Sequence, residues 1–180
     1  MNVCATGHRP PKLGGYDWNS EINKDILTRL ETGLKLVFTI NKDIKILKLK
    51  TGGALGIDQM MFEVAYKLKE EGYPIELELC VPFRKQSAKW FGEDLKRYKH
   101  HLGIADKVTY VDELKDYRNP NEIVGEYYPR KLQKRNEYMV DDSNLVLSYW
   151  DGSKGGTFNC IQYAIGKEIP VINLKTGEVF

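Results

Sequence analysis

Apolar runs of strand length alternate with longer amphipathic stretches along the chain. The runs, which are short and rich in Ile, Leu and Val, lie at residues 2–5, 44–49, 75–81, 108–111, 145–149 and 169–173. The stretches with helical spacing of apolar residues lie at 20–40, 57–72, 86–101, 121–142 and 158–166. Strands that alternate with helices predict an α/β fold, here a Rossmann-like three-layer sandwich with a mostly parallel central sheet.

Local signals refine this picture at a few places. Pro129 is expected to interrupt the helix over residues 121–142, because proline lacks the N–H group that a helix interior uses. The turn at Thr176-Gly177 predicts a terminal strand that ends at Phe180. The chain has no repeat, linker or low-complexity segment, so residues 1–180 are predicted to form a single Rossmann-like domain.

Composition excludes some classes of protein and leaves others open. Hydrophobic residues make up 42% of the chain and charged residues 29%, and the net charge of +2 is too small to indicate nucleic acid or a membrane surface by itself. No apolar run approaches the roughly 20 residues of a membrane span, and the chain opens on a strand pattern rather than a basic and apolar leader. We therefore expect a cytoplasmic protein with no membrane partner.

Cysteine and histidine give no metal signal. The three cysteines are an odd number and lie far apart among apolar neighbours, which favours buried free thiols: Cys4, Cys80 and Cys160. The histidines have no Cys or carboxylate partners at zinc-site intervals. The sequence therefore predicts no metal site and no cofactor.

Three loops are expected to meet at one edge of the sheet. In open α/β sheets ligands bind at the carboxyl ends of the strands, where the strand order reverses. The loops that follow the first, second and fifth predicted strands are Thr6–Pro11, Thr51–Asp58 and Trp150–Thr157. A ligand site built from these loops is the main functional hypothesis.

The loop after the second strand is rich in glycine and opens a helix. Its residues include Gly52, Gly53, Ala54 and Gly56, and Asp58 lies in the first helical turn. Glycine lets a backbone approach a ligand closely, and a helix start attracts phosphate. The same glycines also suit a turn that only packs tightly, and a lone glycine loop does not decide between the two. Asp58 either caps the helix or accepts a ribose hydroxyl.

The loop after the fifth strand gives independent support. Gly155, Gly156 and Thr157 again follow a strand and open a helix, and they offer N–H groups and a hydroxyl to an anion. Lys154 either adds a charge there or is simply solvated. The spacing is not that of a nucleotide-hydrolysing P-loop, and the Gly52 loop lacks Gly-x-Gly-x-x-Gly, which argues against an ordinary dinucleotide-dependent dehydrogenase.

Other side chains at this edge carry charge or aromatic surface. Thr6 and Gly7 precede His8 and Arg9, and an arginine fork suits a phosphate or carboxylate, so we assign this group to the ligand site. The basic stretch over residues 130–138 is either a solvated helix face or, through its inner residues Arg135 and Asn136, part of the same site. Trp150 either stacks on a base or packs at the rim.

A second basic and aromatic cluster lies outside these loops. Residues 85–101 interleave Lys, Arg and His with Trp90 and Tyr98, as a single-stranded nucleic-acid platform does. Acidic residues nearby dilute the cluster, so we favour a plain surface helix. Nucleic acid is therefore the less favoured partner.

Four motifs, in their order along the chain, carry a resemblance to a known family. They are Thr6-Gly7-His8-Arg9-Pro10, Thr51-Gly52-Gly53-Ala54-Leu55-Gly56-Ile57-Asp58, Arg135-Asn136 with Met139, and Gly155-Gly156-Thr157. Together they resemble the SLOG superfamily, which groups DprA/Smf, the LOG phosphoribohydrolases and YpsA-like proteins. The first motif is most similar to the YpsA-like branch. The resemblance covers residues 2 to about 171.

The resemblance implies a Rossmann-like fold that binds a nucleotide or nucleotide-derived ligand, such as a nucleoside phosphate or an ADP-ribose-like molecule. In LOG enzymes a Glu pair after the Gly-Thr loop takes part in cleavage of an N-glycosidic bond; here Asn159 and Cys160 stand at those positions. An amide cannot act as a general acid or base. The first hypothesis is therefore a sensor or regulatory binding module. The alternatives are a nucleoside 5′-monophosphate phosphoribohydrolase and a DprA-like binder of single-stranded nucleic acid. The resemblance also implies a homodimer.

Overall fold

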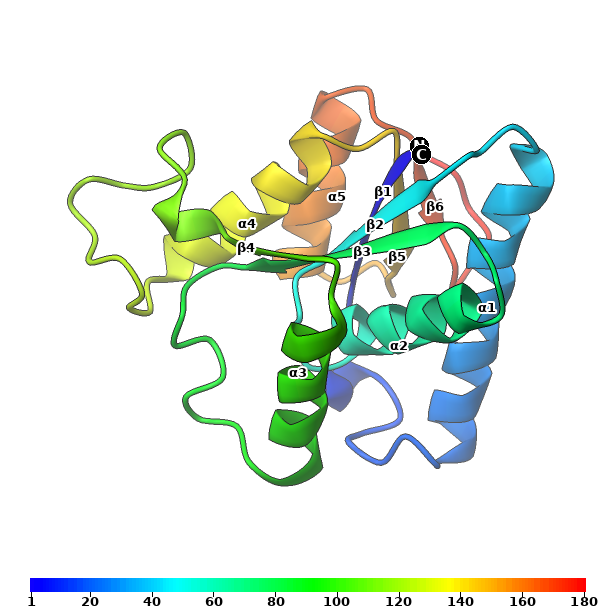
Figure 1. Ribbon diagram of the computed structural model, residues 1–180, viewed down its shortest axis with the longest axis horizontal. Coiled ribbons are helices and arrows are strands. Elements are labelled where there is room, and N and C mark those ends of the chain that lie inside the picture. Colours follow the sequence, from blue (N-terminus) through cyan, green and yellow to red (C-terminus); the bar gives the residue numbers. More distant parts are fainter.

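A computed structural model describes all residues from 1 to 180 (Figure 1). The strands of its sheet are β1 (Asn2–Gly7), β2 (Leu47–Thr51), β3 (Ile75–Val81), β4 (Lys107–Tyr110), β5 (Leu145–Tyr149) and β6 (Val171–Asn173). The α-helices are α1 (Glu21–Ile40), α2 (Ile57–Glu70), α3 (Gly92–Ile104), α4 (Pro129–Asp141) and α5 (Gly156–Gly166). Two short 3-10 helices, Pro10–Lys12 and Val111–Glu113, follow β1 and β4.

The six strands form one sheet in the order β4-β3-β2-β1-β5-β6, and every pair of neighbours is parallel. The chain runs outward from β1 to β4, then crosses to the other side of β1 to add β5 and β6. The strand order therefore reverses at β1, whose carboxyl end lies between those of β2 and β5. This is the place where α/β sheets bind their ligands.

Helices cover both faces of the sheet, as the pattern predicts. Helices α1, α2 and α3 lie on one face, and α4 and α5 on the other (Figure 1). Successive side chains of a strand point to opposite faces, so in β1 Val3 and Ala5 join the larger core while Cys4 joins the smaller one. The predicted three-layer α/β fold is confirmed.

Helix α1 shows how the sequence sets a boundary. The apolar residues on its inner face, including Ile26, Leu30 and Leu34, are completely or almost completely buried in the core. Ser20 is the N-cap, and its hydroxyl accepts a hydrogen bond from the backbone N–H of Asn23 at 3.3 Å. A cap of this kind contributes roughly 1 kcal/mol. No helix of the structure combines the length and the apolar character that crossing a membrane requires.

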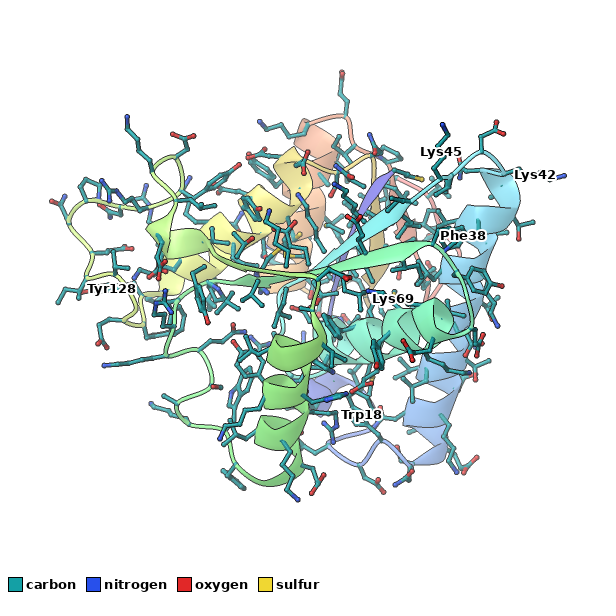
Figure 2. The ribbon with its side chains drawn as sticks, viewed as in Figure 1. Trp18, Phe38, Lys42, Lys45, Lys69 and Tyr128 are labelled. Carbon is teal, nitrogen blue, oxygen red and sulfur yellow. The ribbon has the colours of Figure 1, made fainter.

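The predicted limits of three elements were wrong. Strand β2 begins at Leu47 rather than at residue 44, because residues 41–46 connect α1 to the sheet outside it, with Lys42 and Lys45 projecting outward (Figure 2). Helix α3 begins at Gly92 rather than at residue 86, after a series of turns. The expected terminal strand amounts to a single antiparallel bridge near Phe180.

The predicted helix over residues 121–142 was also too long. The helix is α4, which starts at Pro129 itself. Proline fits the first helical turn, where its missing N–H would have no partner in any case. The residues before it form an irregular segment that follows β4 and runs out beside α4 (Figure 1).

Candidate functional site

A cavity of about 470 Å³ opens at the carboxyl ends of β1, β2 and β5. The loop after β1 contributes Thr6, Gly7, His8 and Arg9, all of them predicted from the sequence. The other predicted residues that line it are Ala54 and Asp58 after β2, Arg135 and Asn136 on α4, and Gly155, Gly156 and Thr157 at the start of α5. Segments far apart in the chain therefore converge at the switch point of the sheet. We call this space the anion cavity.

Four predicted residues do not line the anion cavity. Gly52, Gly53 and Gly56 lie behind its wall, where they pack against the protein itself. Trp150 is turned aside: its indole N–H donates to the carbonyl of Ser153 at 2.8 Å, and its ring lies 5.9 Å from that of Phe158. The aromatic rim position was visible in the sequence, but the direction of the ring depends on these two contacts.

The glycines after β2 are required by close packing. A Cβ atom at Gly52 would lie 0.9 Å from Nη1 of Arg135. At Gly56, where φ is +92°, a Cβ atom would lie 2.4 Å from the carbonyl oxygen of His8. The loop N–H groups are also used, since Ile57 N donates to His8 O at 3.1 Å and Gln59 N to Ala54 O at 3.3 Å. This turn therefore fastens α2 to the loop after β1.

A buried ion pair lies at the floor of the cavity. Nη1 of Arg135 donates to Oδ2 of Asp58 at 3.0 Å, and both side chains are only 7% exposed. The backbone N–H of Ala54 reaches the same oxygen at 3.4 Å. The Nε atom of Arg135 is buried and has no hydrogen-bond partner. The pair fixes α4 against the Gly52 turn and leaves one buried N–H of the guanidinium without an acceptor.

The glycines of the loop after β5 have free space around them, unlike those of the loop after β2. A Cβ atom at Gly152, Gly155 or Gly156 would meet nothing within 4 Å. Helix α5 has no side-chain cap, and Asn159 N is the first of its N–H groups to find a carbonyl, that of Gly155 at 3.0 Å. The N–H groups of residues 156–158 have no acceptor in the chain. They form the kind of helix terminus that binds anions.

Polar side chains join the open loop to the loop after β1. Nε2 of His8 lies 2.7 Å from Oδ1 of Asp151. The same carboxylate accepts hydrogen bonds from the hydroxyl and the N–H of Ser153, and Lys12 donates to that hydroxyl. These bonds from Ser153, with the contact to His8, hold the pKa of Asp151 well below its usual range.

His8 serves this connection rather than offering a free acid or base. Burial lowers the pKa of its imidazole, and this effect outweighs the neighbouring Asp151 carboxylate, which raises it. The ring is therefore neutral at neutral pH. Its backbone carbonyl also accepts the N–H of Ile57, so His8 ties the loop after β1 to both glycine loops.

The charge of the cavity lining is positive. Its cationic side chains are Arg9, Lys12, Arg135 and Lys154, and Asp58 is its only carboxylate, so the formal charge of the lining is +3 with His8 neutral. Arg9 and Lys154 form no hydrogen bond or ion pair with the rest of the chain, so both are free to meet a ligand. Such a lining favours an anion.

Some lining residues were not among the predicted site residues: Pro11, Lys12, Leu132, Ser153 and Lys154. Lys12 and Ser153 stand within or beside the loops that the sequence marked, so their position was a usable signal. Leu132 gave none, because an apolar residue on an amphipathic helix is ordinarily assigned to the core. Neither Asn159 nor Cys160 lines the cavity; the former is exposed and the latter is completely buried.

The fold and the site together define a Rossmann-like α/β protein with a basic cavity at the switch point of its sheet. Residues 3–169 match the sequence profile described as "YpsA: YspA SLOG family", and the chain belongs to this family. The predicted SLOG membership, in its YpsA-like branch, is thus confirmed.

Two bacterial proteins are similar to this chain in sequence. The "Uncharacterized SPbeta prophage-derived protein YoqJ" of Bacillus subtilis (strain 168) is 42% identical over 114 residues, which are 63% of this chain and 67% of that protein. The "UPF0398 protein ABC2016" of Shouchella clausii (strain KSM-K16) is 32% identical over 165 residues, which are 87% of this chain and 76% of that protein.

Two solved structures share the fold. DNA processing protein A (DprA) from Streptococcus pneumoniae superposes with a TM-score of 0.58 at 15% identity, covering 96% of this chain and 49% of that chain. DprA from Helicobacter pylori, whose structure is described with its single-stranded DNA binding mode, gives 0.55 at 15% identity and covers 96% and 64%. The chain spans about half to two thirds of the length of these DprA chains, and the likeness concerns the fold.

Proposed function

We propose that the anion cavity binds a nucleotide or nucleotide-derived ligand, a nucleoside phosphate or an ADP-ribose-like molecule, and that the protein acts as a sensor or regulatory module. The phosphate sits at the start of α5. Arg9 and Lys154 neutralise its charge, and Asp58 accepts a hydroxyl of the ribose.

This proposal rests on the unpaired N–H groups at the start of α5, where Gly156 and Thr157 line the cavity. They stand beside two cations without partners, Arg9 and Lys154. Unpaired backbone donors at a helix start are an anion site when they face a solvent-accessible cavity. Because the equivalent donors of α2 are largely used within the chain, the phosphate belongs to the loop after β5.

Ligand-induced stabilisation tests the proposal directly. Thermal unfolding and titration calorimetry are measured with inorganic phosphate, ribose 5-phosphate, AMP, GMP and ADP-ribose. The double variant Arg9→Ala/Lys154→Ala is expected to bind at least tenfold more weakly, with its unfolding free energy changed by no more than about 0.5 kcal/mol. The control, Lys42→Ala/Lys45→Ala, removes two exposed lysines far from the cavity and is expected to bind normally. Equal affinity in both double variants contradicts the proposal.

Mass spectrometry of small molecules released from the native purified protein identifies the ligand. A recovered nucleoside phosphate or ADP-ribose-like compound supports the proposal. A free base or a ribose phosphate favours the second candidate, a nucleoside 5′-monophosphate phosphoribohydrolase.

The hydrolase candidate depends on one carboxylate. Asp58 is the only one in the cavity lining, and it is paired with Arg135. A glycosidase of the usual kind uses two carboxyl groups. Purified protein is incubated with nucleoside monophosphates and the free base is measured. Release that Asp58→Asn abolishes supports the hydrolase, and no release counts against it.

A third candidate is binding of single-stranded nucleic acid, which the likeness to the Helicobacter pylori DprA structure favours. Phosphate binding by Arg9 and Lys154 serves a strand as well as a mononucleotide. A strand binder retains a labelled oligonucleotide with an affinity that falls steeply with salt. Retention that does not depend on salt, or no retention, disposes of this candidate.

The organisation of the chain is also part of the proposal: residues 1–180 form one domain, and two copies associate as a homodimer. Light scattering on the purified protein measures its molecular mass in solution and so tests the homodimer. A mass near 20.7 kDa rather than twice that value contradicts the homodimer.

A further inference from the structure

A second cavity of about 350 Å³ lies directly beside the anion cavity. The two share Arg9 and Leu132 as a common wall. We propose that this second space is the subsite for the planar aromatic base of the same ligand, so that the phosphate and the base occupy neighbouring cavities on either side of Arg9. The inference rests on the proposed function, because it assumes a ligand whose phosphate occupies the first cavity.

The two cavities differ in the chemistry of their lining. Two of the 16 residues that line the anion cavity are hydrophobic, against five of the ten that line the second. The second cavity also holds three aromatic side chains: Phe83, Trp90 and Tyr127. A charged space next to an aromatic one matches a nucleotide, whose anionic end and flat apolar end are covalently joined. An inorganic anion or a sugar phosphate would leave the aromatic space unfilled.

Two of the three aromatic rings, those of Trp90 and Tyr127, present surface to a ligand. Phe83 is 4% exposed and forms the base of the wall, and Tyr127 meets it edge to face at 5.7 Å while remaining 61% exposed itself. Trp90 is half-buried and is fixed edge to face against Tyr98 at 5.1 Å. A base that stacks on an aromatic side chain typically gains about tenfold or more in affinity.

A buried ion pair holds the segment that carries Tyr127. Nζ of Lys131, on α4, lies 2.7 Å from Oδ2 of Asp112, and both side chains are at most 5% exposed. The same ammonium donates to the carbonyls of Ile123 at 2.7 Å and Glu126 at 3.0 Å. The irregular segment before α4 is therefore anchored immediately next to Tyr127. An anchored backbone of this kind loses less conformational entropy when the ligand binds than a flexible loop would.

The second cavity is also connected to the glycine turn after β2. Gln86, in its lining, donates from Nε2 to the carbonyl of Gly52 at 3.0 Å. Its Oε1 accepts only a long bond from Tyr98, at 3.5 Å, and so keeps capacity for a donor on a base. The turn that carries Asp58 into the first cavity thus fixes a polar group of the second.

The test compares ligands with and without a base. Calorimetry with ribose 5-phosphate and with AMP, GMP, CMP and UMP is run on the native protein and on Tyr127→Ala, Tyr127→Phe and Phe91→Ala. At least one nucleotide is expected to bind the native protein about tenfold tighter than ribose 5-phosphate. Tyr127→Ala is expected to remove that advantage and leave ribose 5-phosphate binding unchanged, while Tyr127→Phe keeps it.

A control variant and a fluorescence measurement separate loss of the base subsite from a general effect of the substitution. Phe91→Ala removes a neighbouring aromatic ring that is 84% exposed and lines neither cavity, so it is expected to bind like the native protein. Nucleotide, but not ribose 5-phosphate, is expected to quench tryptophan fluorescence, and Trp90→Phe is expected to remove that part of the quenching.

The outcomes separate this inference from the proposed function. If nucleotides bind no tighter than ribose 5-phosphate, or if Tyr127→Ala and Phe91→Ala behave alike, the base subsite is overturned while the anion cavity stands. If neither ribose 5-phosphate nor any nucleotide binds, both fail. If an oligonucleotide binds and mononucleotides do not, the second cavity does not serve a mononucleotide base.

Discussion

The two glycine loops at the carboxyl edge of the sheet look alike in sequence and differ in structure. The loop after β2 is filled by the protein: a Cβ atom at Gly52 would collide with Arg135, and one at Gly56 with the backbone of His8. The loop after β5 is open: a Cβ atom at Gly155 or Gly156 would meet nothing within 4 Å. One loop uses glycine to let parts of the chain approach each other, and the other leaves space beside unpaired N–H groups.

The difference shows that a glycine loop before a helix is not by itself a phosphate site. What decides is whether the helix's first N–H groups already have acceptors. In α2 those of Ile57 and Gln59 do, through the carbonyls of His8 and Ala54, whereas in α5 the first acceptor within the chain is reached only by Asn159. The loop after β2 therefore builds the wall of the anion cavity, and we place the ligand's phosphate at the loop after β5.

The largest effect is expected when the buried ion pair behind the packed loop is broken. Arg135→Ala leaves the Asp58 carboxylate buried without its cation, and we expect it to lower the free energy of unfolding by about 3–5 kcal/mol, measured by urea denaturation. Arg130→Ala, on an exposed part of the same helix, is the matched control and should change it by no more than about 0.5 kcal/mol. Similar losses in both variants would show that the ion pair does not hold the packed loop.

A comparable but smaller loss is expected at Gly56. Alanine there must adopt a positive φ, which costs about 1–2 kcal/mol, and its Cβ atom presses on backbone that cannot rotate away, so Gly56→Ala should lose roughly 2–4 kcal/mol. Gly156→Ala, at the start of α5, has free space and should stay within about 1 kcal/mol of the native protein. Thermal unfolding of the pair measures the contrast, and equal losses would refute the distinction between the loops.

The open loop should show the opposite behaviour, a loss of binding without a loss of stability. Gly156→Val adds a branched side chain beside the unpaired N–H groups, and it is expected to weaken binding of ribose 5-phosphate by about tenfold or more while leaving unfolding nearly unchanged. Calorimetry and denaturation on the same preparation test both parts. Unchanged affinity would mean that the phosphate binds elsewhere.

The smallest expected effect is on the stability of the protein at low pH. Hydrogen bonds from Ser153 hold the pKa of Asp151 below its unfolded value of about 3.9, so this carboxylate stabilises the fold fully above about pH 5. That stabilisation is lost as the pH falls through the lower, folded-state pKa. The native protein should therefore be more stable than Asp151→Asn at pH 7, with a smaller advantage at pH 3. Thermal melts at both pH values would contradict this if the difference stayed constant.

Some signals in the sequence were sufficient to predict the fold and the position of the site, and others were not. The alternation of apolar runs and amphipathic stretches predicted the α/β fold, and the rule for parallel sheets predicted which three loops would meet. Boundaries were missed where side-chain contacts overrule a local pattern: the helix expected from residue 121 begins only at Pro129, since the residues before it are held by Lys131 in an irregular path.

The sequence by itself determined the order of the strands and helices, the edge of the sheet where the three loops meet and most of the residues that line the cavity, because each depends on local periodicity or on a loop's place after a strand. Only the tertiary structure decided how the two glycine loops divide their roles. That division depends on Arg135, which is 77 residues from Asp58 in the chain and fills the space beside Gly52. The same is true of the second cavity, whose aromatic wall is assembled from segments that no spacing in the sequence relates.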